Sequence, residues 1–173
     1  MDSNRVLIPP PVLAAAAVIL QRLVPAARRA RGIRRVAAMM LAGGSAGLAL
    51  SAADNFRRQH TTVEPTEPSR ASTLVTTGPN EITRNPMYLG LVGLLSAHAV
   101  TRGSALAWIP VGAFAALLDR VQIPAEEEAL REKFGEAYVA YCERVPRWAR
   151  RPGRLASTRC ARPGHRPHAR FTV

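Results

Sequence analysis

The chain has 173 residues and a formal net charge of +12, carried almost entirely by arginine. This length predicts one domain rather than two lobes. Aromatic residues make up only 5% of the chain, which argues against a nucleic-acid binder, because such proteins usually interleave basic with exposed aromatic residues. A soluble nucleic-acid binder stays open as an alternative, but we expect no nucleic acid and instead anionic membrane lipids. The cysteines and histidines show neither a disulfide nor a metal spacing, so no metal is expected.

The apolar residues are concentrated in four blocks, with the charges between and after them. This pattern is typical of a chain that passes repeatedly from water into lipid. We therefore predict an all-α, multi-pass membrane protein with about four membrane helices and a C-terminal amphipathic helix. The first block, about Val6 to Val24, carries Pro9 to Pro11 in its first turn, where a missing amide donor costs least. A signal peptide is the alternative, because Arg5 precedes the apolar run.

The second block, about Val36 to Ala53, consists largely of small residues. Gly43 and Gly47 match the small-xxx-small spacing that lets helices approach closely in lipid, so a packing helix is predicted. An ordinary soluble core helix is the alternative, since the block is short for a membrane span. The polar stretch that follows, Asp54 to Asn85, is predicted to be a structured loop.

The third and fourth blocks, Met87 to Val100 and Ala105 to Leu118, are separated by a turn signal at residues 101–104 and predict a helical hairpin. Both are short, so they are expected to be tilted or to span incompletely. From Pro124 to about Tyr141 the pattern changes to an amphipathic helix with its acidic residues in the first turn. Residues 1–148 form the predicted domain, with its motifs in 60–148, and residues 149–173 a basic, Pro-rich, disordered tail.

A hairpin brings Arg84 and Arg120 to the same side of the membrane, and the Arg-rich tail predicts that this side is cytoplasmic. With four spans the N-terminus is then cytoplasmic as well. The basic loop Arg28 to Arg35 would lie outside, against the positive-inside tendency. The charge bias of the longer C-terminal part is expected to decide the orientation.

The hairpin also brings two polar segments to one membrane interface. Residues 72–88 lead into the third block, and Glu126 and Glu127 follow the fourth. Carboxylates, amides and a phenol at a lipid edge suit a cationic, amino-acid-bearing ligand. The structural alternative is helix capping by Asn85 and Pro86, interfacial anchoring by Tyr88 and dipole compensation by the glutamates.

The order of several motifs narrows this choice. The sequence has Leu74 to Pro79, then Arg84 to Gly90, then Glu126 and Glu127, followed by residues 130–147 with Phe134-Gly135 and Val145-Pro146-Arg147. Together they resemble the isoprenylcysteine carboxyl methyltransferase family and, more loosely, the phospholipid N-methyltransferases. The resemblance covers about His60 to Trp148, and several motifs in order are more specific than one.

The resemblance implies a helical membrane enzyme that binds S-adenosyl-L-methionine without a Rossmann sheet, whose glycine fingerprint the sequence lacks. Residue matching assigns the cofactor contacts to Thr73, Leu74, Val75, Asn80, Asn85, Pro86, Met87, Tyr88 and Glu126. Asn80 stands where the family usually has tyrosine, and Asn85 where it has histidine. A substrate-contacting arginine of the eukaryotic enzymes falls on Gln122, for which Arg120 is the expected substitute.

The implied reaction transfers a methyl group to a lipid-like or prenylated acceptor at the membrane interface. A sulfonium methyl donor is already activated, so the protein mainly aligns the acceptor and excludes water. A carboxylate acceptor needs no base, whereas an amine must lose a proton, for which Glu126 or Glu127 is the candidate. Cys142 has no positioned base and is interpreted as structural. The alternative function is a catalytically silent membrane scaffold or partner-binding protein that keeps the fold.

Overall fold

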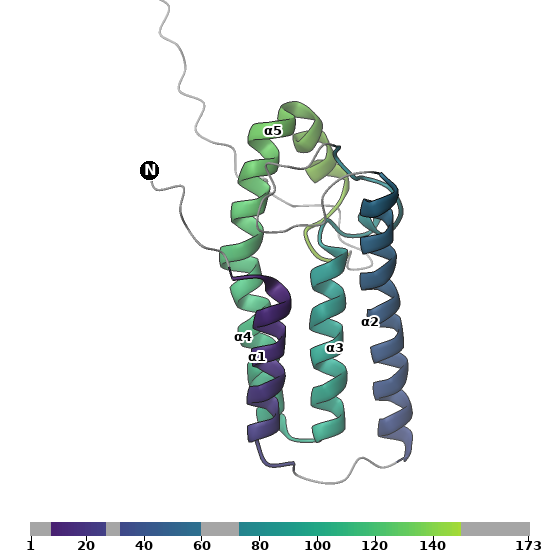
Figure 1. Ribbon diagram of the computed structural model, residues 1–173, viewed down its shortest axis with the longest axis vertical. Helices are drawn as coiled ribbons and strands as arrows, with labels where there is room; N and C mark the ends of the chain where they lie inside the picture. The colour runs from purple at the N-terminus through teal and green to yellow at the C-terminus, as the bar shows by residue number, and fades with distance from the viewer. Residues whose placement is uncertain (1–7, 27–31, 60–72, 150–173) are drawn as a thin grey trace, which may run out of the picture.

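The computed structural model describes residues 8–26, 32–59 and 73–149. The described residues form helices and loops without a strand, which confirms the all-α fold class. Helices α1 to α4 lie side by side along the long axis, and α5 continues α4 before bending back across one end of the bundle (Figure 1). The predicted tail from residue 150 on, residues 27–31 of the basic loop and residues 60–72 of the polar stretch lie outside the described residues.

Helix α1, Pro10–Leu23, has prolines at its first positions as predicted, and it ends at Val24, which is extended because Pro25 follows. Its 14 residues reach about 21 Å, less than the roughly 30 Å of a hydrocarbon core. The fully buried Gln21 ties its end to the neighbouring helices. Its amide nitrogen donates to the carbonyl oxygens of Leu95 at 3.1 Å and Ala107 at 3.0 Å.

Helix α2, Gly32–Arg58, is longer than the apolar block that predicted it. The prediction of a loop from Asp54 on is wrong for residues 54–58, which continue the helix. Two local effects explain the extension. Arg58 pairs with Asp54 one turn earlier at 2.7 Å, and Arg57 and Arg58 lie in the last turn, where positive charge complements the helix dipole.

Helix α2 packs mainly against α3, Pro86–Arg102, through small residues. A Cβ added at Gly90 would lie 2.8 Å from both the Cβ of Ala49 and the carbonyl oxygen of Ser45, so the backbones approach as closely as glycine allows. Gly43 and Gly47 are exposed and have no atom within 4 Å of an added Cβ. The close approach of α2 and α3 therefore depends on a glycine of α3. The prediction that Gly43 and Gly47 pack against a neighbouring helix is wrong for this interface.

The predicted hairpin is present. Helix α3 ends at Gly103, whose φ of 67° is the left-handed conformation that favours glycine at this position. The chain turns through the 3-10 helix η3, Ala105–Ala107, into α4, Trp108–Leu117. We call the end of the bundle that carries this turn the turn end, and the opposite end the motif end. The C-terminal end of α1 and the start of α2 also lie at the turn end (Figure 1).

The amphipathic helix that was predicted to begin at Pro124 is not separate from the fourth block. A π-helical turn η4, Leu118–Gln122, joins α4 to α5, Ile123–Arg144, in one continuous helix. The wider turn accommodates Pro124, which lacks an amide donor. The sharp bend comes later, at Gly135, with φ 53° and ψ −128°. Beyond it, Tyr138, Tyr141, Cys142 and Val145 form a buried cluster that Leu74, Leu130 and Phe134 pack against.

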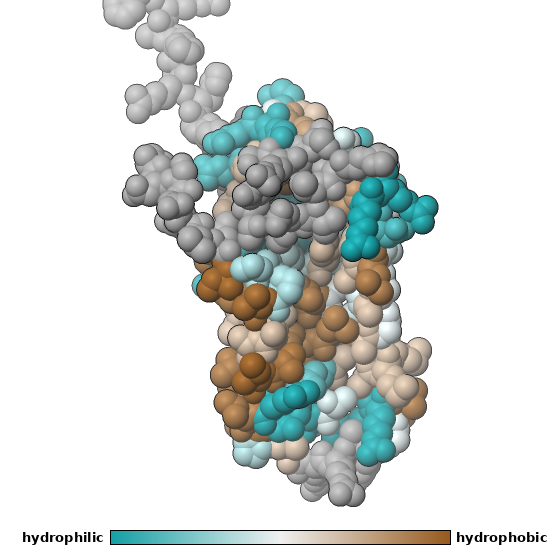
Figure 2. Space-filling model, in the orientation of Figure 1, coloured by the Kyte–Doolittle hydropathy of each residue, from teal (hydrophilic) through white to brown (hydrophobic). Residues whose placement is uncertain are grey.

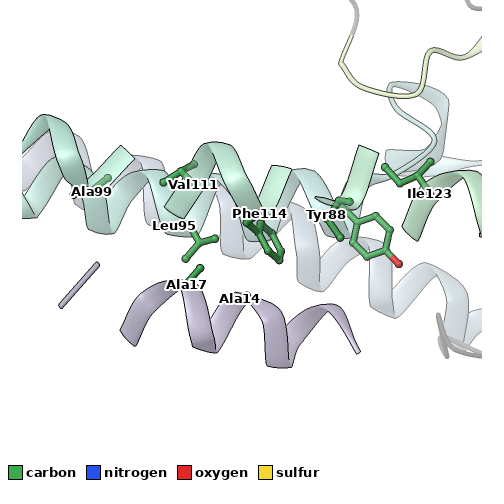
Figure 3. Close-up of a cluster of buried hydrophobic side chains, with 10 residues drawn as sticks. Ala14, Ala17, Tyr88, Leu95, Ala99, Val111, Phe114 and Ile123 are labelled. Carbon is green, nitrogen blue, oxygen red and sulfur yellow. The ribbon is translucent and has the colours of Figure 1, made fainter. Parts of the chain in front are cut away.

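The main core lies between α1, α3 and α4, where Figure 3 shows small residues such as Ala14 and Ala17 of α1 facing Leu95, Val111 and Phe114. The outer surface is unusually apolar. Exposed large side chains include Ile19 and Leu23 of α1, Met39 and Met40 of α2, and Ile109 of α4. On the face seen in Figure 2, apolar side chains cover the middle of the bundle and hydrophilic ones gather at its ends.

Among the described residues, two helices are long and apolar enough to cross a membrane, namely Gly32–Arg58 and the continuous helix Ala105–Arg144. Helix α1 is apolar but shorter, and α3 has 17 residues. The predicted number of about four membrane helices is therefore not confirmed. The soluble-core alternative for the second block is disfavoured, because a water-soluble monomer rarely exposes so much apolar surface.

Candidate functional site

The acidic run at the start of α5 points in three directions. Successive helical residues are rotated by about 100°, so three consecutive glutamates cannot face one partner. Glu126 faces Tyr88 in the first turn of α3, Glu127 is buried against arginines, and Glu128 is exposed. The structure therefore assigns these neighbouring residues three different environments, which their sequence pattern did not distinguish.

Glu126 is held by two uncharged donors. The Tyr88 hydroxyl donates a short hydrogen bond to its Oε1 atom, and the Gln122 amide donates to the same oxygen at 2.7 Å. Gln122 is buried and precedes Glu126 by one helical turn, so it can fix the carboxyl from within the same helix. We call these three residues the Glu126 cluster. They come from two helices that the hairpin brings together, as predicted for Tyr88 and Glu126.

Burial raises the pKa of the Glu126 carboxyl to about 7, and the charge of Glu127 adds to the shift, while the hydrogen bonds from Tyr88 and Gln122 act in the opposite direction. The apolar part of the continuous helix ends before Glu126, since residues 105–122 already contain Asp119 and Arg120. The carboxyl thus lies beyond the apolar stretch, at the motif end. With a pKa near neutrality it can be present as acid or anion.

Glu127 takes part in a buried ion-pair network. Its Oε1 atom lies 2.9 Å from Nη1 of Arg84, and its Oε2 atom accepts from Nη2 of Arg147 at 2.6 Å. The side chains of Arg84 and Glu127 are 4% and 10% exposed, so the charges must balance each other, because an unpaired buried charge is costly. Hydrogen bonding to Glu127 raises the pKa of Arg147 above its usual range.

The segment after α5 closes over the motif loop. The carbonyl oxygen of Arg147 accepts from the Thr83 hydroxyl at 2.9 Å and from the Asn85 amide at 3.0 Å. Its guanidinium also reaches Asp119 in the π-helical turn at 3.2 Å, and Trp148 donates to the same carboxylate oxygen at 2.8 Å. Residues 145–148 thereby join the loop, the π-helical turn and α5.

Asn85 stands at the cap position of α3, as predicted, but its side chain does not cap the helix. Its amide is directed at Arg147 instead. The capping alternative for Asn85 is therefore wrong for its side chain, because residues 145–148 supply a closer partner.

Asn80 lies in the short 3-10 helix η2, Gly78–Glu81, and is 3% exposed. Its backbone carbonyl accepts from the Tyr141 hydroxyl at 2.7 Å. Its side-chain Oδ1 atom is buried and has no hydrogen-bond partner among the described residues. A buried amide oxygen without a partner is costly, so this atom is suited to accept a hydrogen bond from a bound ligand.

The other predicted site residues differ in exposure. Thr73 is exposed, Val75 and Pro86 are buried, and Leu74 and Met87 are half-buried. Leu74 packs against the cluster beyond Gly135. Arg120 is exposed, with no described contact to the Glu126 cluster. The cofactor, substrate and base roles assigned to all these residues remain predictions.

Arg84 and Arg147 were predicted only as members of motifs and, for Arg84, as a charge on one side of the membrane. Asp119 and Trp148 were not predicted as site residues. The residue types within the motifs could have pointed to the two arginines. Arg84, Glu127 and Arg147 belong to the same ordered set of motifs, and a buried carboxylate requires cations. What could not be read was the bend at Gly135, which returns the chain to the loop.

The family model for phospholipid methyltransferases matches residues 33–137. The chain belongs to this family. It is the family of the isoprenylcysteine and phospholipid methyltransferase group, so the resemblance drawn from the motifs is confirmed. An uncharacterized protein of Haemophilus influenzae is 40% identical over 62 residues, which cover 36% of this chain and 98% of that protein. No solved structure matches.

Membership of the phospholipid methyltransferase family identifies a protein of methyltransferase type. Together with the two apolar helices and the exposed apolar surface, it indicates a membrane protein. The matched region of this phospholipid methyltransferase family member includes the loop with Asn80, the start of α3 with Tyr88 and the Glu126 cluster. It ends before residues 145–148, which close the site in this chain.

Proposed function

We propose that this protein is an S-adenosylmethionine-dependent methyltransferase that acts on a lipid-like or prenylated acceptor entering from the membrane. The observation that carries the proposal is the Glu126 carboxyl, which two uncharged donors hold beside the family's motif loop. Its negative charge is not cancelled by these donors. A cationic ligand is therefore the natural partner of the anion.

The residues present suit this cofactor. Glu126 offers a carboxylate to its positive charge, and the unpartnered Oδ1 of Asn80 offers an acceptor to its N–H groups. Val75, Asn85, Pro86, Met87 and Tyr88, with Thr73 and Leu74, are the further residues that would hold it. When bound, S-adenosylmethionine supplies an electrophilic methyl group, so no protein nucleophile is required. Cys142 is fully buried against Arg84, which supports a structural role.

The charges around the site favour an amine over a carboxylate as the acceptor. The guanidinium groups nearest the acidic run, those of Arg84 and Arg147, are paired with Glu127. Gln122 is used by Glu126, and Arg120 is exposed. An ammonium acceptor must lose a proton before it can attack, and a carboxyl with a pKa of about 7 can take it near neutral pH. Glu127, bound by two arginines, is the weaker candidate.

We further propose a multi-pass arrangement in which α3 and α4 cross as a pair, with the site and the C-terminal tail on the cytoplasmic side. Helix α3 is short, but its pairing with the longer α2 supports a membrane position. A lipid acceptor would then diffuse laterally to the motif end, where the Glu126 cluster follows the apolar part of the helix. The acceptor's tail stays in lipid while its headgroup reaches the site.

The test is direct binding of S-adenosylmethionine to the detergent-purified protein by calorimetry. Glu126→Ala should weaken binding at least about tenfold, as expected for loss of a charge-assisted contact worth about 1.5–3 kcal/mol. Glu128→Ala removes an exposed carboxylate from the same run and should leave binding unchanged. Absence of binding to the intact protein would overturn the proposal and favour the hypothesis of a catalytically silent scaffold.

Transfer itself is measured with radiolabelled cofactor and vesicles that contain phosphatidylethanolamine. Label should enter the lipid amine with the intact protein and not with Glu126→Gln. If label entered only the carboxylate of a prenylated peptide, the preference for an amine would be contradicted, but the proposal of a methyltransferase would stand.

A further inference from the structure

The turn end carries four guanidinium groups and no described acidic residue. Arg22 comes from the end of α1, Arg34 and Arg35 from the start of α2, and Arg102 from the end of α3. No aspartate or glutamate occurs in the described segments 18–26, 32–41 and 96–108 that form this end. The motif end, by contrast, combines arginines with carboxylates such as Asp54, Asp119 and Glu127. The positive charge of the turn end is therefore uncompensated within the described chain.

Two of these arginines lie against the backbone of neighbouring elements. Arg102 donates through Nη2 to the carbonyl oxygens of Arg22 and Val24, which lie at the end of α1. Arg34 lies against the hairpin turn, since a Cβ added at Gly103 would be only 2.6 Å from its Nη2 atom. Both guanidinium groups thus lie at the turn end. Neither contact neutralises their charge.

The position of Arg34 and Arg35 adds to the imbalance. They lie in the first turn of α2, which has no acidic residue. The start of a helix is the positive end of its dipole, where basic side chains are unfavourable and anions are favourable. A departure from this rule calls for a compensating partner. An anion at the turn end would satisfy both the helix start and the guanidinium groups.

We propose that the turn end is a binding site for anionic phospholipid headgroups. The side chains that border the arginines indicate which anionic ligand binds there. The arginines border helices whose outer faces carry Leu23, Ile33, Val36 and Met40, all largely exposed. A lipid offers acyl chains to these apolar surfaces and a phosphate to the arginines at once. This proposal does not depend on the proposed enzymatic activity.

Tryptophan fluorescence can report on this end alone. The chain has two tryptophans, and Trp108 begins α4 at the turn end with 47% of its surface exposed. Trp148 lies at the motif end and is removed by Trp148→Phe. In the full-length protein carrying this change, reconstituted in phosphatidylcholine vesicles, quenching of Trp108 by brominated phosphatidylglycerol is compared with quenching by brominated phosphatidylcholine. Basic residues at the motif end then affect the signal little.

Helix α2 supplies a matched pair of variants, with two adjacent arginines at each end. R34Q/R35Q should reduce the preference of the turn end for phosphatidylglycerol by about fivefold per arginine, the factor that corresponds to about 1 kcal/mol per basic residue near a membrane surface. R57Q/R58Q should retain the preference. Circular dichroism shows that each variant is folded before the comparison is made.

Three results would overturn the proposal. The two brominated lipids could quench Trp108 equally in the parent protein. R57Q/R58Q could lower the preference as much as R34Q/R35Q. R34Q/R35Q could leave the preference for phosphatidylglycerol unchanged.

Discussion

Glu126 should make cofactor binding depend on pH around neutrality. Its pKa is raised to about 7, so about a tenth of the molecules carry the anion at about pH 6 and about nine tenths at about pH 8. If the anion holds the cationic cofactor, affinity should rise roughly tenfold over this range. Glu126→Gln keeps the shape of the side chain but cannot ionise, so its weaker affinity should lack this increase. Calorimetric titrations of both proteins in one set of buffers measure the difference.

The same pKa predicts the opposite trend for stability. Because the carboxyl has a pKa of 4.5 when unperturbed and about 7 in the fold, the folded protein binds the proton more tightly. Its stabilising contribution is complete below about pH 4.5 and is lost as the pH rises through about 7, by about 3 kcal/mol. The melting temperature of the ligand-free protein, relative to Glu126→Gln, should therefore fall over this range. Affinity that is flat or falls with pH in the unaltered protein would refute the assigned role of the Glu126 anion.

Three further substitutions test the fold that holds the site. Gly135→Ala should lower the stability of the protein by about 1–3 kcal/mol, because the backbone conformation of Gly135 is accessible mainly to glycine. Gly112→Ala is the control, since Gly112 is helical and has open space around it, and thermal melting in detergent compares the two variants. Gly90→Ala should separate α2 from α3 and lower stability by about 1–3 kcal/mol, whereas Gly44→Ala, with open space around it, should not; equal melting temperatures would contradict the packing. Gln21→Leu should cost about 1–3 kcal/mol by removing the buried hydrogen bonds that fix α1, and faster proteolysis near residue 24 would report the loosened helix.

The order of the motifs in the sequence identified the family, and the predicted hairpin placed Tyr88 near Glu126. Both are readable in sequence because they depend on local signals. A turn at Gly103 and apolar blocks on either side suffice to bring the start of α3 opposite the end of α4. The beginning of α3 at Pro86 was readable for the same reason, since proline favours the first position of a helix.

Other features depended on contacts between distant residues. The sequence offers Gly43 and Gly47 as a packing motif, but the close contact forms at Gly90, because which face of α2 meets α3 is decided by the whole bundle. The sequence also did not predict that the helix continues through Pro124. A proline normally suggests a helix start, and only the preceding π-helical turn lets the helix continue.

Local patterns of residues were enough to predict that the chain is helical, that its apolar residues favour a membrane, and that Glu126 and Glu127 lie near the motif loop. The different surroundings of these two glutamates depend on how the helices pack. Adjacent helical residues point about 100° apart, so one carboxyl meets Tyr88 and Gln122 while the other meets Arg84 and Arg147. The second pair of partners is available because the bend at Gly135 returns the chain to the loop, and a bend of that kind is set by packing rather than by local pattern.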